Sequence, residues 1–367
     1  MKRFYLLSIL FLQIGFISAT DYSKVDEQSH YVPFQFKTPV EIAKYLTHNL
    51  RSDEEKVRSI YFWIANTIRF DPIQVPGTDY RFSILGKRNF LKEVLDSHKG
   101  VCQHYAVLFD TLCRSVGIKS YFVCGYTRNN GQLSELSHAW NAVMLDGKYY
   151  DIDVTWSAGY IEDDKFRQEF HDDLFLVSPA KFISSHIPFD PVWQFLDNPV
   201  THYSVQKNDF SHPKTPKRFN YSDSIKSIST RDILTNLISE TIRIQKFGIT
   251  NKLIQEYYYS NLRNIDLLRY NLVVRNFNQA IENFNAYMTS KSHQSNEVTV
   301  IDNKAQNRFI LSRQQLEQAE TELKSVTVND EWVAKNITGL QNAITKLKKE
   351  LENEEIILKK ILQLKAQ

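Results

Sequence analysis

Glycine, cysteine and long apolar runs are scarce in this chain, and each shortage excludes a class of protein. Only 11 of the 367 residues are glycine, so a glycine-rich phosphate-binding loop is not expected. Three cysteines are too few for a disulfide scaffold of this length. Beyond residue 19, no segment approaches the roughly 18 consecutive apolar residues of a membrane-spanning helix. The 42% of apolar and 24% of charged residues are typical of a globular protein.

Charge of neither sign dominates, because 45 Lys and Arg residues face 42 Asp and Glu residues. Two of the positive charges, Lys2 and Arg3, lie in an N-terminal segment that we expect to be removed. A chain so balanced has no electrostatic basis for non-specific nucleic-acid binding. We therefore predict no nucleic-acid partner.

The N-terminus is typical of a secretory signal peptide. A basic start, Met1-Lys2-Arg3, precedes a mostly apolar run over 4–17, and Ser18-Ala19 supplies small residues for cleavage. We predict a signal peptide over 1–19, cut near Ala19, and export to the periplasm or the medium. The mature chain is expected to hold no integral membrane segment.

Hydrophobic periodicity predicts an α+β domain over 20–200, a linker over 201–231 and a helical region over 232–367. In the first domain we expect helices over 39–50, 54–68, 90–97 and 102–116 and a strand over 119–125. Ser52 and Glu55 read as a capping box. Asp146-Gly147 predicts a hairpin turn between strands 139–145 and 148–154.

The C-terminal region has no proline and two glycines after residue 231, and helices are expected over 233–247, 251–259, 265–288, 309–324 and 331–367. The last carries apolar residues at heptad positions, with Glu354 at one of them. This coiled-coil-like pattern suits a hairpin within one chain, which we favour, or a dimeric coiled coil. Self-association or a protein partner on these helices therefore stays open.

Three residues form a candidate catalytic group: Cys102, His138 and Asp153. Gly100-Val101-Cys102 places the thiol at a helix start, where unpaired N–H groups and the macrodipole favour the thiolate. The same N–H groups could hold an oxyanion, with the Cys102 backbone N–H and Gln103 as candidates. The indole of Trp63 and a donor from the loop 72–90 are also open.

The hairpin predicts that His138 and Asp153 are neighbours. If Asp146-Gly147 is a two-residue turn, paired residue numbers sum to 293, so His138 lies opposite Thr155. Asp153 then shares its face at a diagonal distance. Asp151 also shares the face, one step further away. A Cys, a His and an orienting Asp form the arrangement used for acyl transfer.

Each of these residues also has a plainer interpretation. Taken singly, Cys102, His138 and Asp153 are more often structural, and only their combination favours catalysis. Cys113 and Cys124 are assigned to the core, with a Cys113–Cys124 disulfide as an alternative. His98, Cys102, His104 and Cys113 cluster in sequence but lack zinc-ligand spacing, so no metal is predicted.

Three motifs together resemble the transglutaminase-like superfamily. They are Lys99-Gly-Val-Cys-Gln-His-Tyr-Ala106, Ser137-His-Ala-Trp-Asn-Ala-Val143 and Asp153-Val-Thr-Trp156. The residues from Asp173 to Gln194 resemble the next segment of the subgroup that contains kyphoscoliosis peptidase and cytokinesis-type proteins. The resemblance covers roughly 50–200. It implies a papain-like core, in which a Cys helix packs on an antiparallel sheet, with Cys102 as nucleophile, His138 as base and Asp153 as third member. It implies no cofactor.

These observations predict an exported thiol enzyme acting on peptide or glutamine amide bonds of a protein or peptide substrate. We favour a cysteine peptidase or amidase. A cross-linking transglutaminase is the first alternative, since only the group that attacks the thioester differs. The second is a catalytically idle scaffold whose helical half binds a partner.

Overall fold

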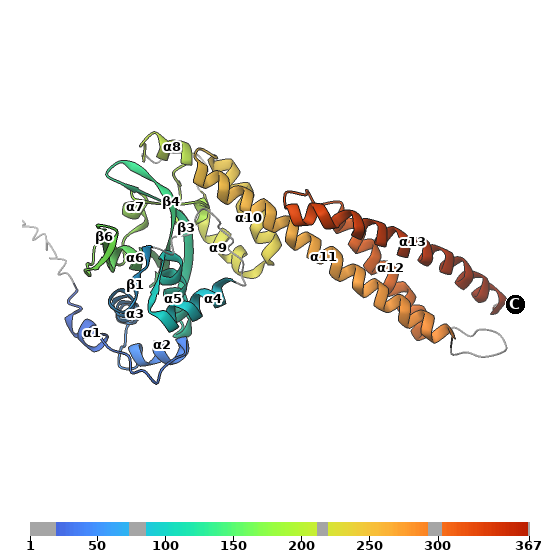
Figure 1. Ribbon diagram of the computed structural model, residues 1–367, viewed down its shortest axis with the longest axis horizontal. Coiled ribbons are helices and arrows are strands. Elements are labelled where there is room, and N and C mark those ends of the chain that lie inside the picture. The colour runs from blue at the N-terminus through green and yellow to red at the C-terminus, as the bar shows by residue number, and fades with distance from the viewer. Residues whose placement is uncertain (1–19, 73–85, 211–218, 293–302, 366–367) are drawn as a thin grey trace, which may run out of the picture. The chain divides into compact units, whose positions relative to one another are not determined.

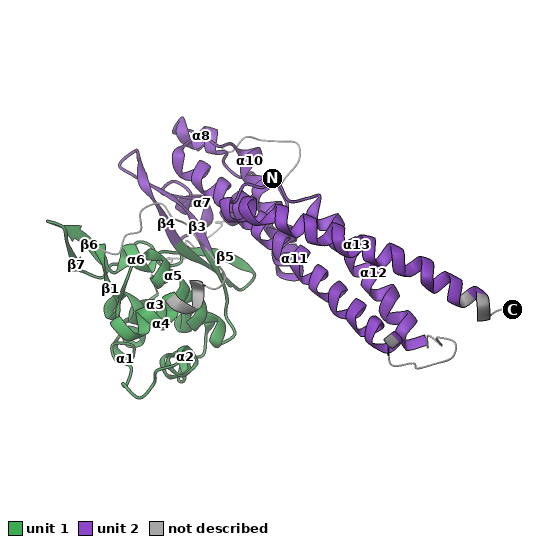
Figure 2. Cartoon of the chain, turned by 45° about the vertical axis from the view of Figure 1, so that its right-hand side comes forward, with its two compact units in different colours: residues 1–74, 90–122, 140–176 green, residues 75–89, 123–139, 177–367 purple. Residues whose placement is uncertain are grey.

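The computed structural model describes residues 20–72, 86–210, 219–292 and 303–365. The predicted signal peptide lies outside them. The chain folds into two compact units, which Figure 2 shows in different colours. Unit 1 comprises 1–74, 90–122 and 140–176, and unit 2 comprises 75–89, 123–139 and 177–367. Each unit is described by itself.

Unit 1 is built on α1 (Ser23–Gln28), α2 (Pro39–Thr47), α3 (Asp53–Thr67) and α5 (Cys102–Ser115). The predicted capping box is present at α3, where Ser52 accepts the N–H of Glu55 and Glu55 accepts that of Ser52. Thr38 and Glu41 cap α2 in the same way. The helix α4 (Gly86–Ser97) and the short parallel pair β1 (Arg69–Phe70) and β2 (Lys99–Gly100) lead into α5.

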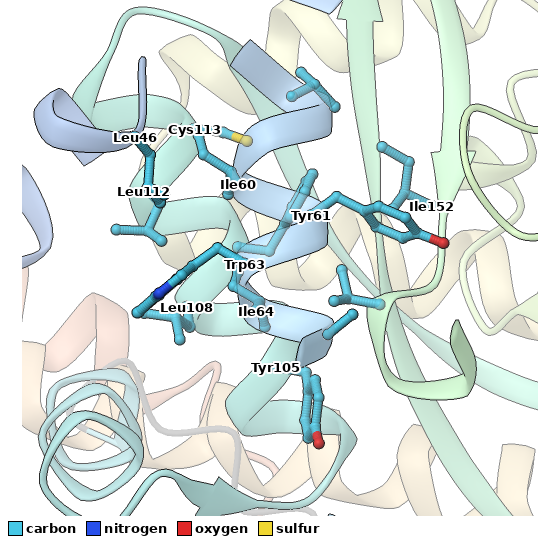
Figure 3. Close-up of a cluster of buried hydrophobic side chains, with 14 of the residues drawn as sticks. Leu46, Ile60, Tyr61, Trp63, Ile64, Tyr105, Leu108, Leu112, Cys113 and Ile152 are labelled. Carbon is cyan, nitrogen blue, oxygen red and sulfur yellow. The ribbon is translucent and has the colours of Figure 1, made fainter. Parts of the chain in front are cut away.

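One buried cluster holds these helices together. Figure 3 shows the labelled side chains of α3 and α5 meeting one another beside Ile152. Leu108, Leu112 and Cys113 of α5 belong to this cluster, as does Val143 of the sheet. The Asn141 side chain also donates to the main-chain oxygen of Ala106 at 3.0 Å. The helix that begins at the cysteine therefore packs on the sheet, which confirms the predicted α+β, papain-like class.

The sheet has the strand order β5-β4-β3-β8, formed by β3 (Lys119–Asn129), β4 (Gln132–Leu145), β5 (Lys148–Ile152) and β8 (His186–Pro188). The predicted hairpin register is confirmed, because Leu145 pairs with Lys148 and Asn141 with Ile152. Asp146 and Gly147 both have positive φ, as a type I′ turn requires.

Pairing stops at Ile152, earlier than the predicted strand end at residue 154. Asp153 caps the short helix α6 (Val154–Ser157), so Thr155 is helical and is not a strand partner of His138. The hairpin β6 (Gly159–Glu162) and β7 (Lys165–Gln168) comes next in the chain.

Arg58 is a buried cation of unit 1 that bonds two acidic residues. Its guanidinium donates to both oxygens of Asp26, at 2.7 and 2.6 Å, and to Asp172 at 2.5 Å. Five aromatic rings lie within 6 Å of its carbon Cζ, those of Tyr22, Tyr61, Phe62, Phe170 and Phe175. Burial alone would lower the pKa of Arg58, but the hydrogen bonds and charges of Asp26 and Asp172 outweigh burial and raise it.

Unit 2 continues with α7 (Pro179–Phe182), the 3-10 helix η2 (Pro191–Gln194) and α8 (His202–Gln206). The stretch 201–231, expected to be a linker, contains α8 and also α9 (Tyr221–Thr230). Thr201 and Asn220 cap these helices with their side chains. Val205 of α8 is buried in a cluster with Ile187 and Phe189. Hydrophobic periodicity is weak in this polar stretch because its helices are short.

The C-terminal half is helical, as predicted, and Figure 1 shows its long helices. They are α10 (Ile233–Phe247), α11 (Lys252–Ser292), α12 (Asn303–Leu323) and α13 (Glu331–Lys365). The two helices expected over 251–259 and 265–288 are a single helix, α11. Ser260 and Asn261 interrupt the apolar stripe in the sequence, but both are buried residues within α11.

The heptad residues of α13 pack within the chain. Ile344, Leu347, Leu351 and Leu358 share a buried cluster with residues of α11 and α12. Glu354, the charged residue of the heptad pattern, is buried as well. Its Oε1 accepts from the Tyr287 hydroxyl at 3.0 Å and from the Lys291 ammonium. No helix among the described residues is long and apolar enough to cross a membrane.

Candidate active site

Cys102 is the first residue of α5 and is half-buried. Val101 precedes it in an extended conformation, with φ −101° and ψ 178°, so the chain passes from β2 into the helix at the thiol. The N–H groups of His104 and Tyr105 reach the main-chain oxygen of Val101. Within the described ranges, the amide N–H groups of Cys102 and Gln103 have no acceptor. Two adjacent donors therefore lie beside the sulfur.

His104 holds the peptide immediately before Cys102. Its Nδ1 accepts the N–H of Val101 at 3.1 Å, and its Nε2 lies 3.2 Å from the Glu93 carboxylate on α4. Because Nδ1 is an acceptor, the hydrogen of the neutral ring must be on Nε2, where it donates to Glu93. A Cβ on Gly100 would lie 2.5 Å from that of His104. The glycine thus leaves the space that the ring occupies.

We expect His104→Ala to lower the rate of Cys102 alkylation and to destabilise the domain by about 1–3 kcal/mol, because the buried Val101 N–H loses its partner. His104→Gln should restore most of the alkylation rate and most of the stability, since glutamine at this third helical position can accept the same N–H. Iodoacetamide rates and thermal unfolding measure the two effects.

Val107→Ala is the matched control, because it removes buried volume from α5 without touching its N-terminus. It should lower thermal stability and leave the alkylation rate of Cys102 unchanged. Equal rates in His104→Ala and His104→Gln would show that the hydrogen bond does not position the thiol.

His138 lies on β4 and is 8% exposed. In unit 2 its ring centroid is 5.8 Å from that of His186 on β8. The His186 ring stacks on Phe182 at 4.0 Å, and its Nδ1 lies 2.8 Å from the Ser185 hydroxyl. His186 has no role in the sequence-based prediction of the site. Its position beside His138 depends on strand pairing between β3 and β8, which no local pattern indicates.

Asp153 is fully buried in unit 1. Its Oδ1 accepts the N–H groups of Thr155 at 2.9 Å and Trp156 at 3.1 Å. The pKa of Tyr105 on α5 is raised mainly by burial and in small part by the charge of Asp153. Asp151 has different surroundings: burial raises the pKa of its carboxyl, and the Trp140 side chain partly opposes this. Asp153 therefore accepts main-chain N–H groups at the start of α6, whereas Asp151 is a buried carboxyl on β5, and the two acids are not interchangeable.

Of the predicted triad, Cys102 and Asp153 belong to unit 1 and His138 to unit 2. Their assembly into one catalytic group stays a prediction. Among the other oxyanion candidates, Trp63 is a core residue of α3, and most of the loop 72–90 lies outside the described residues. The three cysteines are not joined by a disulfide. In the described ranges His98, Cys102, His104 and Cys113 do not gather as metal ligands.

Comparison with known proteins identifies the class of this domain. Residues 40–154 match the family model of the transglutaminase-like superfamily. The chain therefore contains a transglutaminase-like domain, and the matched residues include Cys102, His138 and Asp153.

Among curated proteins, the chain is similar to kyphoscoliosis peptidase of Mus musculus, with 33% identity over 169 residues, 43% of this chain and 24% of that protein. It is also similar to hillarin of Drosophila melanogaster, with 27% identity over 188 residues, 45% of this chain and 22% of that protein. The chain thus spans about a quarter of these relatives. A crystal structure of a TGase covers 44% of this chain and 40% of its own, with 19% identity and a TM-score of 0.27.

Proposed function

We propose that this chain is an exported thiol-dependent enzyme that transfers acyl groups from peptide or glutamine amide bonds of proteins. Cys102 is the nucleophile, His138 the general base and acid, and Asp153 the residue that orients His138. The observation that carries the proposal is the position of the Cys102 sulfur at a helix start, beside two amide N–H groups without acceptors. Those donors suit the oxyanion of a tetrahedral intermediate.

In the proposed reaction the Cys102 thiolate, paired with the protonated imidazole of His138, attacks the carbonyl carbon of the amide. The carbonyl oxygen becomes an oxyanion, which the N–H groups of Cys102 and Gln103 bind. As the carbon–nitrogen bond breaks, His138 gives its proton to the departing amine, and a thioester remains on Cys102. Asp153 keeps one ring tautomer and stabilises the imidazolium.

Water or a second amine then attacks the thioester, and His138 accepts the proton of the attacking group. The carbon–sulfur bond breaks, and the Cys102 thiolate is released as the leaving group. Attack by water gives hydrolysis, and attack by an amine gives a cross-link. We favour hydrolysis, because a protein named as a peptidase is among the relatives. A cross-linking transglutaminase is the alternative, supported by the family model.

The test is the pH dependence of iodoacetamide alkylation at Cys102. An ordinary thiol ionises near pH 8.5, so at pH 6 less than about 1% of it reacts as thiolate. A Cys102–His138 ion pair should instead react at pH 6, and His138→Ala should reduce that rate by about 100-fold. Asp153→Asn should reduce it by about tenfold, because the imidazolium loses its carboxylate.

Asp153→Asn is also the control for folding, since an asparagine oxygen can cap α6 as the carboxylate does. Peptide mapping distinguishes Cys102 from Cys113, which is buried, and from Cys124, which is half-buried. If Cys102 alkylates like an ordinary thiol, with or without His138, the proposed enzyme activity is refuted. The idle scaffold with a partner-binding helical half would then be the better proposal.

A further inference from the structure

A cavity of about 530 Å³ opens in unit 1, on residues to which the proposed function assigns no role. Its walls come from the segment between α1 and α2, from α2 and α3, and from the end of α4 with His98. The volume is within the range of small-ligand sites, about 300–1,000 Å³.

Apolar and aromatic side chains make up most of the cavity lining. Ile42 and the indole of Trp63 are buried at its base. Val32, Phe36 and Leu95 are partly buried and pack against the same core. A site with this lining excludes a strongly hydrated group and suits an aromatic or branched aliphatic side chain.

Two aromatic residues of the lining remain largely exposed. Phe34 is 83% and Tyr31 63% exposed, although the chain buries many of its other aromatic side chains. They are separated by Val32 and Pro33, which also line the cavity. Large exposed aromatic side chains beside an apolar hollow are typical of a surface that binds a partner group.

The lining holds two charged residues of opposite sign, Lys37 and Asp96. Asp96 is neutralised by Lys92, whose ammonium is 2.5 Å from its carboxylate. Lys37 is exposed, and within the described residues its ammonium has no ion pair. His30 and His98 complete the polar part of the lining. The Glu41 carboxylate accepts the main-chain N–H of Lys37 at 3.3 Å. The ammonium of Lys37 is the group of the lining with which an incoming carboxylate can pair.

We propose that this cavity binds a segment of a protein in which an aromatic side chain is next to an acidic residue. The aromatic ring enters the hollow over Trp63, and the carboxylate pairs with Lys37. The aromatic side chains Phe34 and Tyr31 close over the inserted ring. The inference is independent of the proposed chemistry, because it uses neither Cys102 nor His138.

Three blocked dipeptides test the proposal: N-acetyl-Asp-Phe-amide, N-acetyl-Lys-Phe-amide and N-acetyl-Asp-Ala-amide. Binding to the full chain carrying Cys102→Ser is measured by saturation-transfer NMR, so that turnover cannot confuse the result. We expect the Asp-Phe peptide to bind at least fivefold more tightly than either of the others.

Lys37→Glu should weaken the Asp-Phe peptide by about fivefold or more and improve the Lys-Phe peptide, which a lost contact alone would not do. Phe34→Ser should weaken both phenylalanine peptides and leave the fold intact, because the side chain is largely exposed. Lys119→Glu, exposed in the same unit but not in the lining, is the matched charge control. It should change none of the affinities.

Equal affinity for the Asp-Phe and Lys-Phe peptides would overturn the assigned charge preference. Unchanged binding in Phe34→Ser would place the peptide elsewhere and overturn the site. Neither result affects the alkylation test of Cys102, so this inference and the proposed enzyme can fail separately.

Discussion

Replacing Arg58 with methionine should lower the free energy of unfolding by about 3 kcal/mol. The change keeps much of the side-chain volume but removes a guanidinium that is only 2% exposed. Asp26, with its side chain 18% exposed, would then hold a charge with little water and no cation. Removing one partner of a buried ion pair costs about 3–5 kcal/mol, and the 59% exposure of Asp172 places the expected value at the lower end.

Arg58→Lys should recover only part of this loss. A lysine restores the charge, but it cannot bond both oxygens of Asp26 with two parallel N–H groups as Arg58 does. Lys56→Ala is the control, since its ion pair with Asp53 is exposed and should be worth less than about 1 kcal/mol. Urea unfolding of the three variants measures the differences. An Arg58→Met protein as stable as the wild type would mean that burying the charges offsets their attraction.

Acid should destabilise unit 2 through His202, by about 3 kcal/mol between pH 6.5 and 4. Burial lowers the pKa of this histidine to about 4. Its Nε2 lies 3.0 Å from the main-chain oxygen of Phe189, and its Nδ1 lies 3.0 Å from the Tyr126 hydroxyl. The carbonyl can only accept, so Nε2 carries a hydrogen. The lowered pKa keeps the folded ring neutral at pH 7, with Nδ1 as the acceptor of the Tyr126 hydroxyl.

Below pH 6.5 the unfolded chain binds a proton at this residue and the folded chain does not, so stability falls as the pH falls. The decline is complete near pH 4, where the folded form also takes up the proton. Glu240 acts in the opposite sense, because burial and the charge of Asp190 raise its pKa to about 7. The raw pH curve therefore mixes opposing contributions, and a variant is needed to separate them.

His202→Gln provides that comparison, since its amide can still donate to Phe189 but does not titrate. Urea unfolding of both proteins at pH 7, 6, 5 and 4.5 gives the difference in stability at each pH. The wild type should lose stability relative to His202→Gln over this range. A constant difference would show that His202 is protonated in the folded state as readily as in the unfolded chain.

Local rules predict the parts of the fold that depend on neighbours in sequence. Asp146-Gly147 specifies the hairpin and its register, and Ser52 with Glu55 specifies the start of α3. The same rules place Cys102 at the start of α5. They cannot predict where pairing stops: β5 ends at Ile152 because Asp153 caps a helix there, and the alternation of faces ends with it.

Distant partners explain the features that no local pattern reveals. Asp266 looks like an ordinary solvated acid within α11, yet it is fully buried. It accepts the Thr327 N–H at 2.9 Å and also bonds Asn329, more than 60 residues away. His104 and Arg58 are similar cases, since Glu93 and Asp172 are not at any recognisable spacing from them.

Glu354 gives the helical half a unique alignment. A heptad pattern is nearly unchanged by a shift of seven residues, so α13 could slide by two turns and still present leucines and isoleucines to its neighbours. Such a slide would bring Leu347 or Ile361 to Tyr287 and Lys291, and would leave the carboxylate of Glu354 among apolar side chains without a cation. An unpaired charge in that position is costly. One acidic residue therefore distinguishes the native pairing of α13 from pairings shifted by seven residues. It would likewise disfavour a second chain that packed against α11 and α12 in place of α13.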